Sequence, residues 1–285
     1  MTKGEWRRDM SFIGSNWERY FENPDEGLGT TYERFVLHQY YRKLKERYSI
    51  GSVLEVPSFG MTGISGINSM WWAHGGTKVT VADENRHRVR LIKGVWQTLG
   101  FEADFIHLNK GYAPLPFRSK SFDMGWNFAA LHLVSGIDDF LGELARVAAK
   151  VIFIVTPNDQ SLFQRRRRRG TGHGTHDGGS CPGDIKDAMR RVGWHLAEEG
   201  YLDVPPWPDI AMKKEDYLRK IGLKWMGNLI GGAKKSPVCI LDYYNGKNSR
   251  MEKEVLKFSL LEHSPKAFKR LWAHHRYFIF TPGSE

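Results

Sequence analysis

Residues 52–83 read SVLEVPSFGMTGISGINSMWWAHGGTKVTVAD, and this stretch decides the fold. It begins with a short apolar run, Val53–Val56, passes through a glycine-rich segment and a second apolar stretch, and ends with the run Val79–Ala82 and Asp83. Short apolar runs bounded by Gly and Pro are typical of strands, so the pattern predicts strand, turn, helix, turn and strand. A carboxylate at the tip of the second strand can accept hydrogen bonds from ribose hydroxyls. The stretch therefore predicts the first half of a nucleotide-binding unit.

These residues resemble the class I S-adenosylmethionine-dependent methyltransferases, in particular the type 11-like branch that acts on small molecules, quinones and lipids. In that family the first strand ends in an acidic residue before a glycine-rich loop, as Glu55 does here, and Asp83 matches the ribose-binding acid. The resemblance implies S-adenosylmethionine as cofactor, with Glu55, Gly60 and Gly63 near its methionine end. The loop departs from the family's Gly-x-Gly-x-Gly, because Pro57 stands at the first glycine and the segment continues SFGMTG.

A second resemblance covers residues 114–123, which read PLPFRSKSFD. Many small-molecule methyltransferases carry a similar Leu-Pro-Phe…Ser-Phe-Asp stretch just before their fourth strand. In those relatives an Asp four residues before the Leu contacts the adenine amino group, and here Gly111 occupies that position. The resemblance implies that Asn109, or the backbone of Gly111 and Tyr112, takes over this contact.

The segment 127–132, NFAALH, follows the predicted fourth strand, at the edge where open α/β sheets bind ligands. We predict Asn127 as a cofactor contact, and Asn127 and His132 as candidates for the methyl-transfer centre. The alternative for His132 is a structural histidine at a helix end. Methyl transfer is an in-line displacement that depends chiefly on alignment, and a base is needed only for poorly ionised hydroxyls or carbon acids. The sequence can therefore reveal a cofactor site while hiding the catalytic residues.

Apolar runs alternate with amphipathic helical stretches, which requires a parallel sheet covered on both faces. We predict an α/β fold with a doubly wound, mostly parallel seven-stranded sheet and an α-rich insertion near the C-terminus. The strands are expected at residues 53–56, 79–82, 103–108, 122–126, 151–155, 195–202 and 276–281. The family resemblance places the last strand antiparallel at the sheet edge. Thr30 and Glu33 have the spacing of a capping box, which predicts a helix from about Thr31 to Tyr48.

Four segments are expected along the chain: an N-terminal arm, a cofactor-binding core, a substrate-cap insertion and a final core strand. Their bounds are 1–29, 30–202, 203–270 and 271–285. We expect the arm's aromatic residues Trp6, Phe12, Trp17, Tyr20 and Phe21 to pack on the body. In the insertion we expect helices near 217–229 and 255–261 and a strand near 238–244. The insertion's aromatic residues, Trp207, Tyr217, Trp225, Tyr243 and Tyr244, are expected either to wall an acceptor pocket or to form a second small core.

The chain has 285 residues and a net charge of +10, to which the run Arg165–Arg169 contributes strongly. Such a run is a solvated loop, or it contacts an anionic substrate, a membrane surface or nucleic acid. We predict that it forms a lid over an anionic group of the acceptor. No apolar run is long enough to span a bilayer, and residues 1–10 lack a signal-peptide pattern. With only two cysteines and no disulfide scaffold, a cytoplasmic protein is expected.

One group of side chains, His173, His176, Asp177 and Cys181, has the chemistry of a zinc or iron site. Its spacing matches no known motif, so we assign no metal ligand. Cys181 is either an ordinary thiol or a nucleophile of the kind that attacks pyrimidine rings. The Pro-Pro-aromatic tetrapeptide of amino-methylating nucleic-acid enzymes is absent, since residues 127–130 read NFAA.

The sequence thus leaves three hypotheses. The first is a methyltransferase acting on a small-molecule or lipid-like acceptor that is anionic or aromatic. The second is a nucleic-acid, in particular RNA, methyltransferase, favoured only by charge. The third is a non-catalytic methyltransferase-fold interaction protein whose altered loop no longer binds the cofactor.

Overall fold

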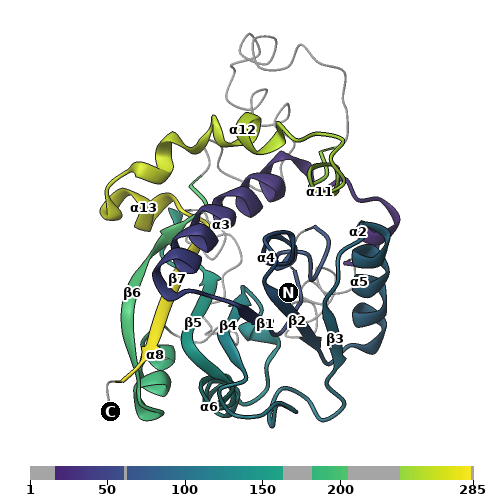
Figure 1. Ribbon diagram of the computed structural model, residues 1–285. Coiled ribbons are helices and arrows are strands. Elements are labelled where there is room, and N and C mark those ends of the chain that lie inside the picture. The colour runs from purple at the N-terminus through teal and green to yellow at the C-terminus, as the bar shows by residue number, and fades with distance from the viewer. Residues whose placement is uncertain (1–16, 61–62, 163–181, 205–237, 284–285) are drawn as a thin grey trace, which may run out of the picture.

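A computed structural model describes residues 17–60, 63–162, 182–204 and 238–283 (Figure 1). Seven strands form one sheet in the order β3-β2-β1-β4-β5-β7-β6. Their bounds are β1 Ser52–Glu55, β2 Lys78–Asp83, β3 Asp104–His107, β4 Phe122–Phe128, β5 Ala148–Pro157, β6 Trp194–Leu202 and β7 His275–Pro282. Strands β1 to β5 pair in parallel, and β7 is antiparallel to both β5 and β6. The predicted α/β fold with a mostly parallel seven-stranded sheet is confirmed.

The last strand does not lie at the sheet edge as expected, because β7 is inserted between β5 and β6. Its central residues Phe278 and Phe280 are fully buried, which suits a strand paired on both sides. The edge strand on this side of the sheet is β6, and several of its central side chains are exposed. The polar character of β6 and the apolar run of β7 together explain the observed order.

Helices cover both faces of the sheet (Figure 1). The helical segments are α2 Arg19–Glu22, α3 Gly27–Tyr48, α4 Met70–His74, α5 Arg86–Thr98, η1 Leu131–Leu133, α6 Ile137–Val147, α8 Pro182–Arg191, α11 Leu241–Tyr244, α12 Met251–Leu256, η2 Ser259–His263 and α13 Lys266–Trp272. One core joins α3, α4 and α5 to alternate strand residues such as Val53 and Trp126, and the other joins α6 and α8 to neighbours such as Leu54. This alternation is the period of two that a sheet buried on both faces requires.

Helix α3 begins four residues earlier than expected, at Gly27, so Thr30 and Glu33 lie inside the helix and form no capping box. Both side chains are buried. The extra turn is held by Arg34, whose guanidinium Nε lies 2.6 Å from a Glu26 carboxylate oxygen and whose Nη2 donates to the Ile64 carbonyl oxygen at 2.9 Å. These partners are distant in sequence or outside the helix, so local spacing did not reveal them.

The strand predicted near 238–244 is wrong, since this region contains the short helix α11. The Tyr244 hydroxyl is 3.0 Å from His38 Nε2, and the Tyr243 ring lies 5.1 Å from the Phe35 ring. Both tyrosines therefore pack on α3 in the main core. The expected helix near 255–261 is divided between α12 and η2.

Several predictions lie outside the described residues: the lid at Arg165–Arg169, the group at 173–181, the helix near 217–229 and the arm before Trp17. Trp207, Tyr217 and Trp225 fall there too. Among the helices that the structure does describe, none combines the length and apolarity of a membrane span.

Candidate cofactor site

The first strand ends at Glu55, whose side chain is buried beneath the start of α4. A Glu55 carboxylate oxygen accepts a hydrogen bond from the Ser69 backbone nitrogen at 3.1 Å, and the Ser69 hydroxyl accepts one from Trp126 at 2.9 Å. Burial raises the pKa of Glu55 to about 7. The predicted cofactor residue Glu55 thus ties β1 to the segment that begins α4.

The loop after β1 uses its glycines for close packing. Gly60 donates its backbone N–H to the Ser65 hydroxyl at 3.3 Å. Gly63 has φ +73°, and a Cβ added there would lie 2.2 Å from a Glu26 carboxylate oxygen. At this site a side chain would be strained and would also collide with the start of α3. In this structure Gly63 therefore joins the loop to α3.

Asp83, the predicted ribose acid, is 0% exposed at the carboxyl end of β2. One carboxylate oxygen accepts from the Ser58 backbone nitrogen at 3.2 Å and from the Ser58 hydroxyl at 3.1 Å. The other accepts from the Asn85 backbone nitrogen at 2.8 Å and from Arg88 Nη1 at 2.9 Å. All four acceptor positions are filled by the chain, so a ribose hydroxyl reaches Asp83 only by displacing one of these donors.

Arg88 is covered by two aromatic rings. Its guanidinium carbon lies 4.8 Å from the centre of the Trp17 ring and 4.6 Å from the centre of the Phe59 ring. Trp17 and Phe59 are both buried, so the described end of the arm packs on the body as expected. Sequence analysis missed Ser58 and Arg88. An Arg one turn into the helix that follows a buried acid is the signal that points to such a pair.

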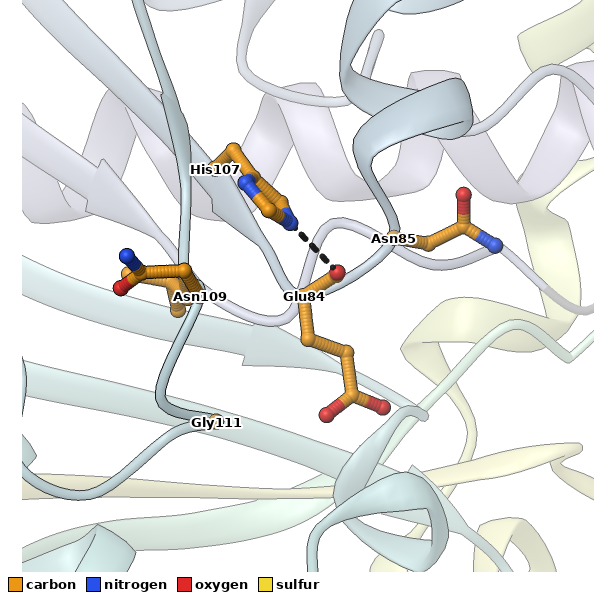
Figure 2. Close-up of a pocket in the computed structure, with 6 residues that line it drawn as sticks. Glu84, Asn85, His107, Asn109 and Gly111 are labelled. Carbon is orange, nitrogen blue, oxygen red and sulfur yellow. Dashed lines mark hydrogen bonds between the residues drawn. The ribbon is translucent and has the colours of Figure 1, made fainter.

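A pocket of about 420 Å³ opens between the carboxyl ends of β2 and β3 (Figure 2). It is lined by Glu84, Asn85, His107, Leu108, Asn109 and Gly111. His107 Nε2 is 3.1 Å from the Glu84 carbonyl oxygen, and the Glu84 side chain extends away from His107 (Figure 2). Partial burial and the neighbouring Asp83 raise the pKa of Glu84. Of the predicted cofactor residues, Asn109 and Gly111 line this pocket.

The other predicted residues do not line the pocket. Asn127 is fully buried, and its amide donates to the Val56 carbonyl oxygen at 3.1 Å and accepts from the Ala130 nitrogen at 3.3 Å. It thereby fixes the turn after β4 to β1. Tyr112 is buried, with its ring 6.0 Å from the Phe140 ring.

His132 lies in η1, beside the glycine-rich loop. Its ring is 6.3 Å from that of Phe59, and burial lowers its pKa, so the imidazole is neutral near pH 7. A neutral imidazole can accept a proton, which keeps His132 available as a base.

Residues 61–153 match the family model of a methyltransferase domain. The chain carries a methyltransferase domain of the S-adenosylmethionine-dependent class. The match begins just after Gly60, so β1 and the altered start of the loop, with Pro57 and Phe59, lie outside it. No curated protein sequence matches the chain.

Among solved structures, the plantazolicin methyltransferase BamL, in complex with a triazolic desmethylPZN analog and SAH, shares 13% sequence identity. The alignment covers 97% of this methyltransferase and 91% of BamL, with a TM-score of 0.55. The YcgJ protein from Bacillus subtilis shares 14% identity, with 87% of this chain and 98% of that chain covered and a TM-score of 0.49. At such identities the likeness to BamL shows a common fold.

S-adenosylmethionine is the cofactor of this class of domain, and the residues that line the pocket offer groups that suit an adenosine. A carboxylate at Glu84 can accept hydrogen bonds from vicinal hydroxyls, Asn109 offers amide hydrogen-bonding groups, and Leu108 and His107 offer apolar and flat surface. Glu84, Asn85, His107 and Leu108 were missed by sequence analysis. The position of Glu84, directly after the expected acid, was the available signal.

Proposed function

We propose that this methyltransferase transfers a methyl group to a small-molecule or lipid-like acceptor and holds the adenosine part of its cofactor in the pocket between β2 and β3. The observation that carries the proposal is this pocket, which joins an accessible carboxylate, Glu84, to Asn109 and Gly111 inside the matched domain. Open α/β sheets bind ligands at this edge.

S-adenosylmethionine, when bound, supplies a methyl group on a sulfonium that is already activated for displacement. The protein's task is then to bind, align and exclude water. Glu84 accepts hydrogen bonds from the ribose hydroxyls, and Asn109 with the backbone of Gly111 contacts the base. Glu55, next to the loop, lies near the methionine part of the cofactor.

The acceptor lies on the side of His132 and Phe128 in this proposal. Phe128 and Phe59 are buried apolar rings, and His132 stands next to Phe59. Apolar and aromatic surface with few polar groups suits a small organic acceptor. The solved BamL complex, whose bound analog is a small molecule, supports the same class. The RNA alternative is supported only by the net charge of +10.

Calorimetry with S-adenosylmethionine and the wild-type chain tests the first part. We expect binding, and we expect Glu84→Gln to weaken it by roughly 10- to 100-fold, because hydrogen bonds to a charged group are worth about 1.5–3 kcal/mol. Glu102→Gln, at an exposed residue just before β3, is the matched control and should bind normally. A wild-type chain that does not bind the cofactor favours the non-catalytic interaction protein.

Mass spectrometry on a panel of phenols, quinones, fatty acids and RNA then tests the acceptor class. Methylation of one of the organic compounds supports the proposal. Methylated RNA, together with salt-sensitive retention of the protein on RNA, would overturn it.

A further inference from the structure

A second group of buried polar side chains lies at the other half of the sheet's ligand edge. Glu33 comes from α3, Asp203 directly follows β6 and His275 begins β7. They are 3%, 0% and 8% exposed. One metal-ligating atom from each lies within 4.8 Å of those from the other two. Because these residues are far apart in sequence, their spacing gave no sign of a metal site.

Two polar atoms in this group lack hydrogen-bond partners among the described residues. Asp203 Oδ2 is 2.8 Å from His274 Nδ1, but Asp203 Oδ1 has no partner. His275 Nε2 is 3.5 Å from a Glu33 carboxylate oxygen, and His275 Nδ1 has no partner. Buried polar groups are nearly always satisfied, so two unsatisfied atoms at one place are available to a ligand.

The charges around the group point to a cation. Glu33 and Asp203 bring two buried carboxylates to one place, where two negative charges repel each other. The neighbouring cation Arg34 is already held by Glu26. A third buried carboxylate, Glu262, is paired with Lys269 at 3.7 Å. Among the described residues, the Glu33 and Asp203 carboxylates therefore have no buried Lys or Arg paired with them, and only His274 and His275 lie beside them.

The backbone at Asp203 is also unusual. Its φ is +64°, in the left-handed region that costs a non-glycine residue free energy. Such strained residues cluster at functional sites, where the surrounding structure holds them in place. Here the strained residue is the one whose carboxylate is only half satisfied.

We propose that Glu33, Asp203 and His275 bind a divalent transition-metal ion. Two carboxylates and one imidazole suit Zn²⁺, Mn²⁺ or Fe²⁺ better than Ca²⁺ or Mg²⁺, which favour oxygen ligands. Ligands about 2.1 Å from one ion lie roughly 3–4 Å apart, so small side-chain rotations close the observed separations. His274 fixes the orientation of the Asp203 carboxylate, as outer partners of metal ligands do.

The proposed ion joins α3 to β6 and β7, and it lies near the acceptor side of the sheet. The His275 ring is 4.8 Å from the ring of Phe128, the last residue of β4. It is a site separate from the cofactor pocket and does not depend on the proposed function. Its test requires no cofactor and no acceptor.

The experiment uses the full chain, stripped with a chelator and titrated with Zn²⁺ or Mn²⁺ alone. We expect one ion per chain by elemental analysis and a rise of several degrees in Tm, because a ligand that binds only the folded state stabilises it. With Co²⁺ as a spectroscopic probe, His275→Gln and Glu33→Gln should each abolish the absorption of the bound ion. His263→Gln, at an exposed histidine, is the control and should leave it unchanged.

A double variant, His173→Gln with His176→Gln, separates this site from the sequence's other metal-like group. Retained stoichiometry and Tm shift in this variant support the proposal. Loss of the ion there, unchanged binding in folded His275→Gln and Glu33→Gln, or no binding of either metal by the wild type would overturn it. Circular dichroism establishes that each variant is folded, and Glu33→Gln serves if His275→Gln is not.

Discussion

Asp83 and Asp203 are both fully buried and both stand where a strand ends, yet their surroundings differ. Asp83 accepts four hydrogen bonds, one of them from Arg88, whereas Asp203 has one oxygen without a partner among the described residues. A buried carboxylate is stable where the chain supplies its hydrogen-bond donors. Where the chain does not, a bound ligand can stabilise it. The comparison therefore distinguishes a carboxylate whose acceptor positions are all filled by the chain from one that has an acceptor position left for a ligand.

The largest expected effect is that of Asp83→Asn, because it leaves Arg88 buried without its charge partner and places an amide donor against existing donors. We expect the free energy of unfolding to fall by about 3–5 kcal/mol. Asp203→Asn in the metal-free chain is the matched variant. Asn tolerates φ > 0 and can still accept from His274, so we expect a loss below about 1 kcal/mol. Urea denaturation compares the two, and equal losses would contradict the distinction.

Glu55 is also a buried carboxylate, and it shows how burial with few hydrogen-bond donors affects the pH dependence of stability. Its folded pKa of about 7 exceeds the ordinary 4.5, so the folded chain keeps a proton that the unfolded chain releases in this window. The contribution of Glu55 to the free energy of unfolding therefore falls as pH rises from about 4.5 to about 7. Glu55→Gln should abolish this dependence, changing the difference from wild type by up to about 3 kcal/mol. Urea denaturation across this range measures the difference, with Glu102→Gln as the control, and a pH-independent difference for Glu55→Gln would argue against the raised pKa.

Gly63 connects the region around Asp83 with the region around Asp203. It packs the loop after β1 against α3, the helix that carries Glu33. In Gly63→Ala the new Cβ meets Glu26 and Arg34, and we expect a loss of about 2–3 kcal/mol from overpacking and backbone strain. Gly76→Ala is the matched control, since its φ is +76° and nothing lies within 4 Å of the added Cβ. It should cost only the strain, about 1 kcal/mol. Thermal unfolding measures both, and a similar shift in the two variants would show that the loop yields at Gly63.

The smallest expected difference between a variant and its matched control concerns a single donor to Asp83. Ser58→Ala removes the hydroxyl hydrogen bond and keeps the backbone one, so we expect a loss of about 1–2 kcal/mol. Ser119→Ala, at an exposed residue, should change the free energy of unfolding by less than about 0.5 kcal/mol. If Ser58→Ala behaves like Ser119→Ala in urea denaturation, the carboxylate of Asp83 is less dependent on its donors than the geometry indicates.

The sequence predicted the strands and the long helix α3 because their signals are local. The apolar runs around Val53, Val79 and Val151 carry enough period and composition to place strands within a few residues. The region 238–244 failed because an apolar, aromatic run is compatible with either structure, and its packing on α3 decided for a helix.

The site residues were harder to predict for a physical reason. Glu55 and Asp83 could be located from strand ends. Whether a carboxylate can still accept a hydrogen bond from a ligand depends on donors such as Ser58 and Arg88, which only the folded chain brings together. The same holds for Glu33 and His275, whose proximity is created by α3 crossing the ends of the strands. Hydrogen-bond saturation is a property of the tertiary structure, so no spacing rule expresses it.

The position of β6 at the edge of the sheet bears on association between copies of the chain. Exposed strand edges invite pairing with another chain, which natural sheets oppose with charge, bulges and short strands. Strand β6 carries Glu198 and Glu199 and has an irregular register between Leu196 and Glu198, and the opposite edge strand, β3, has only four residues. Both edges are therefore poor templates for strand addition, and we expect concentrated solutions to resist aggregation through sheet extension.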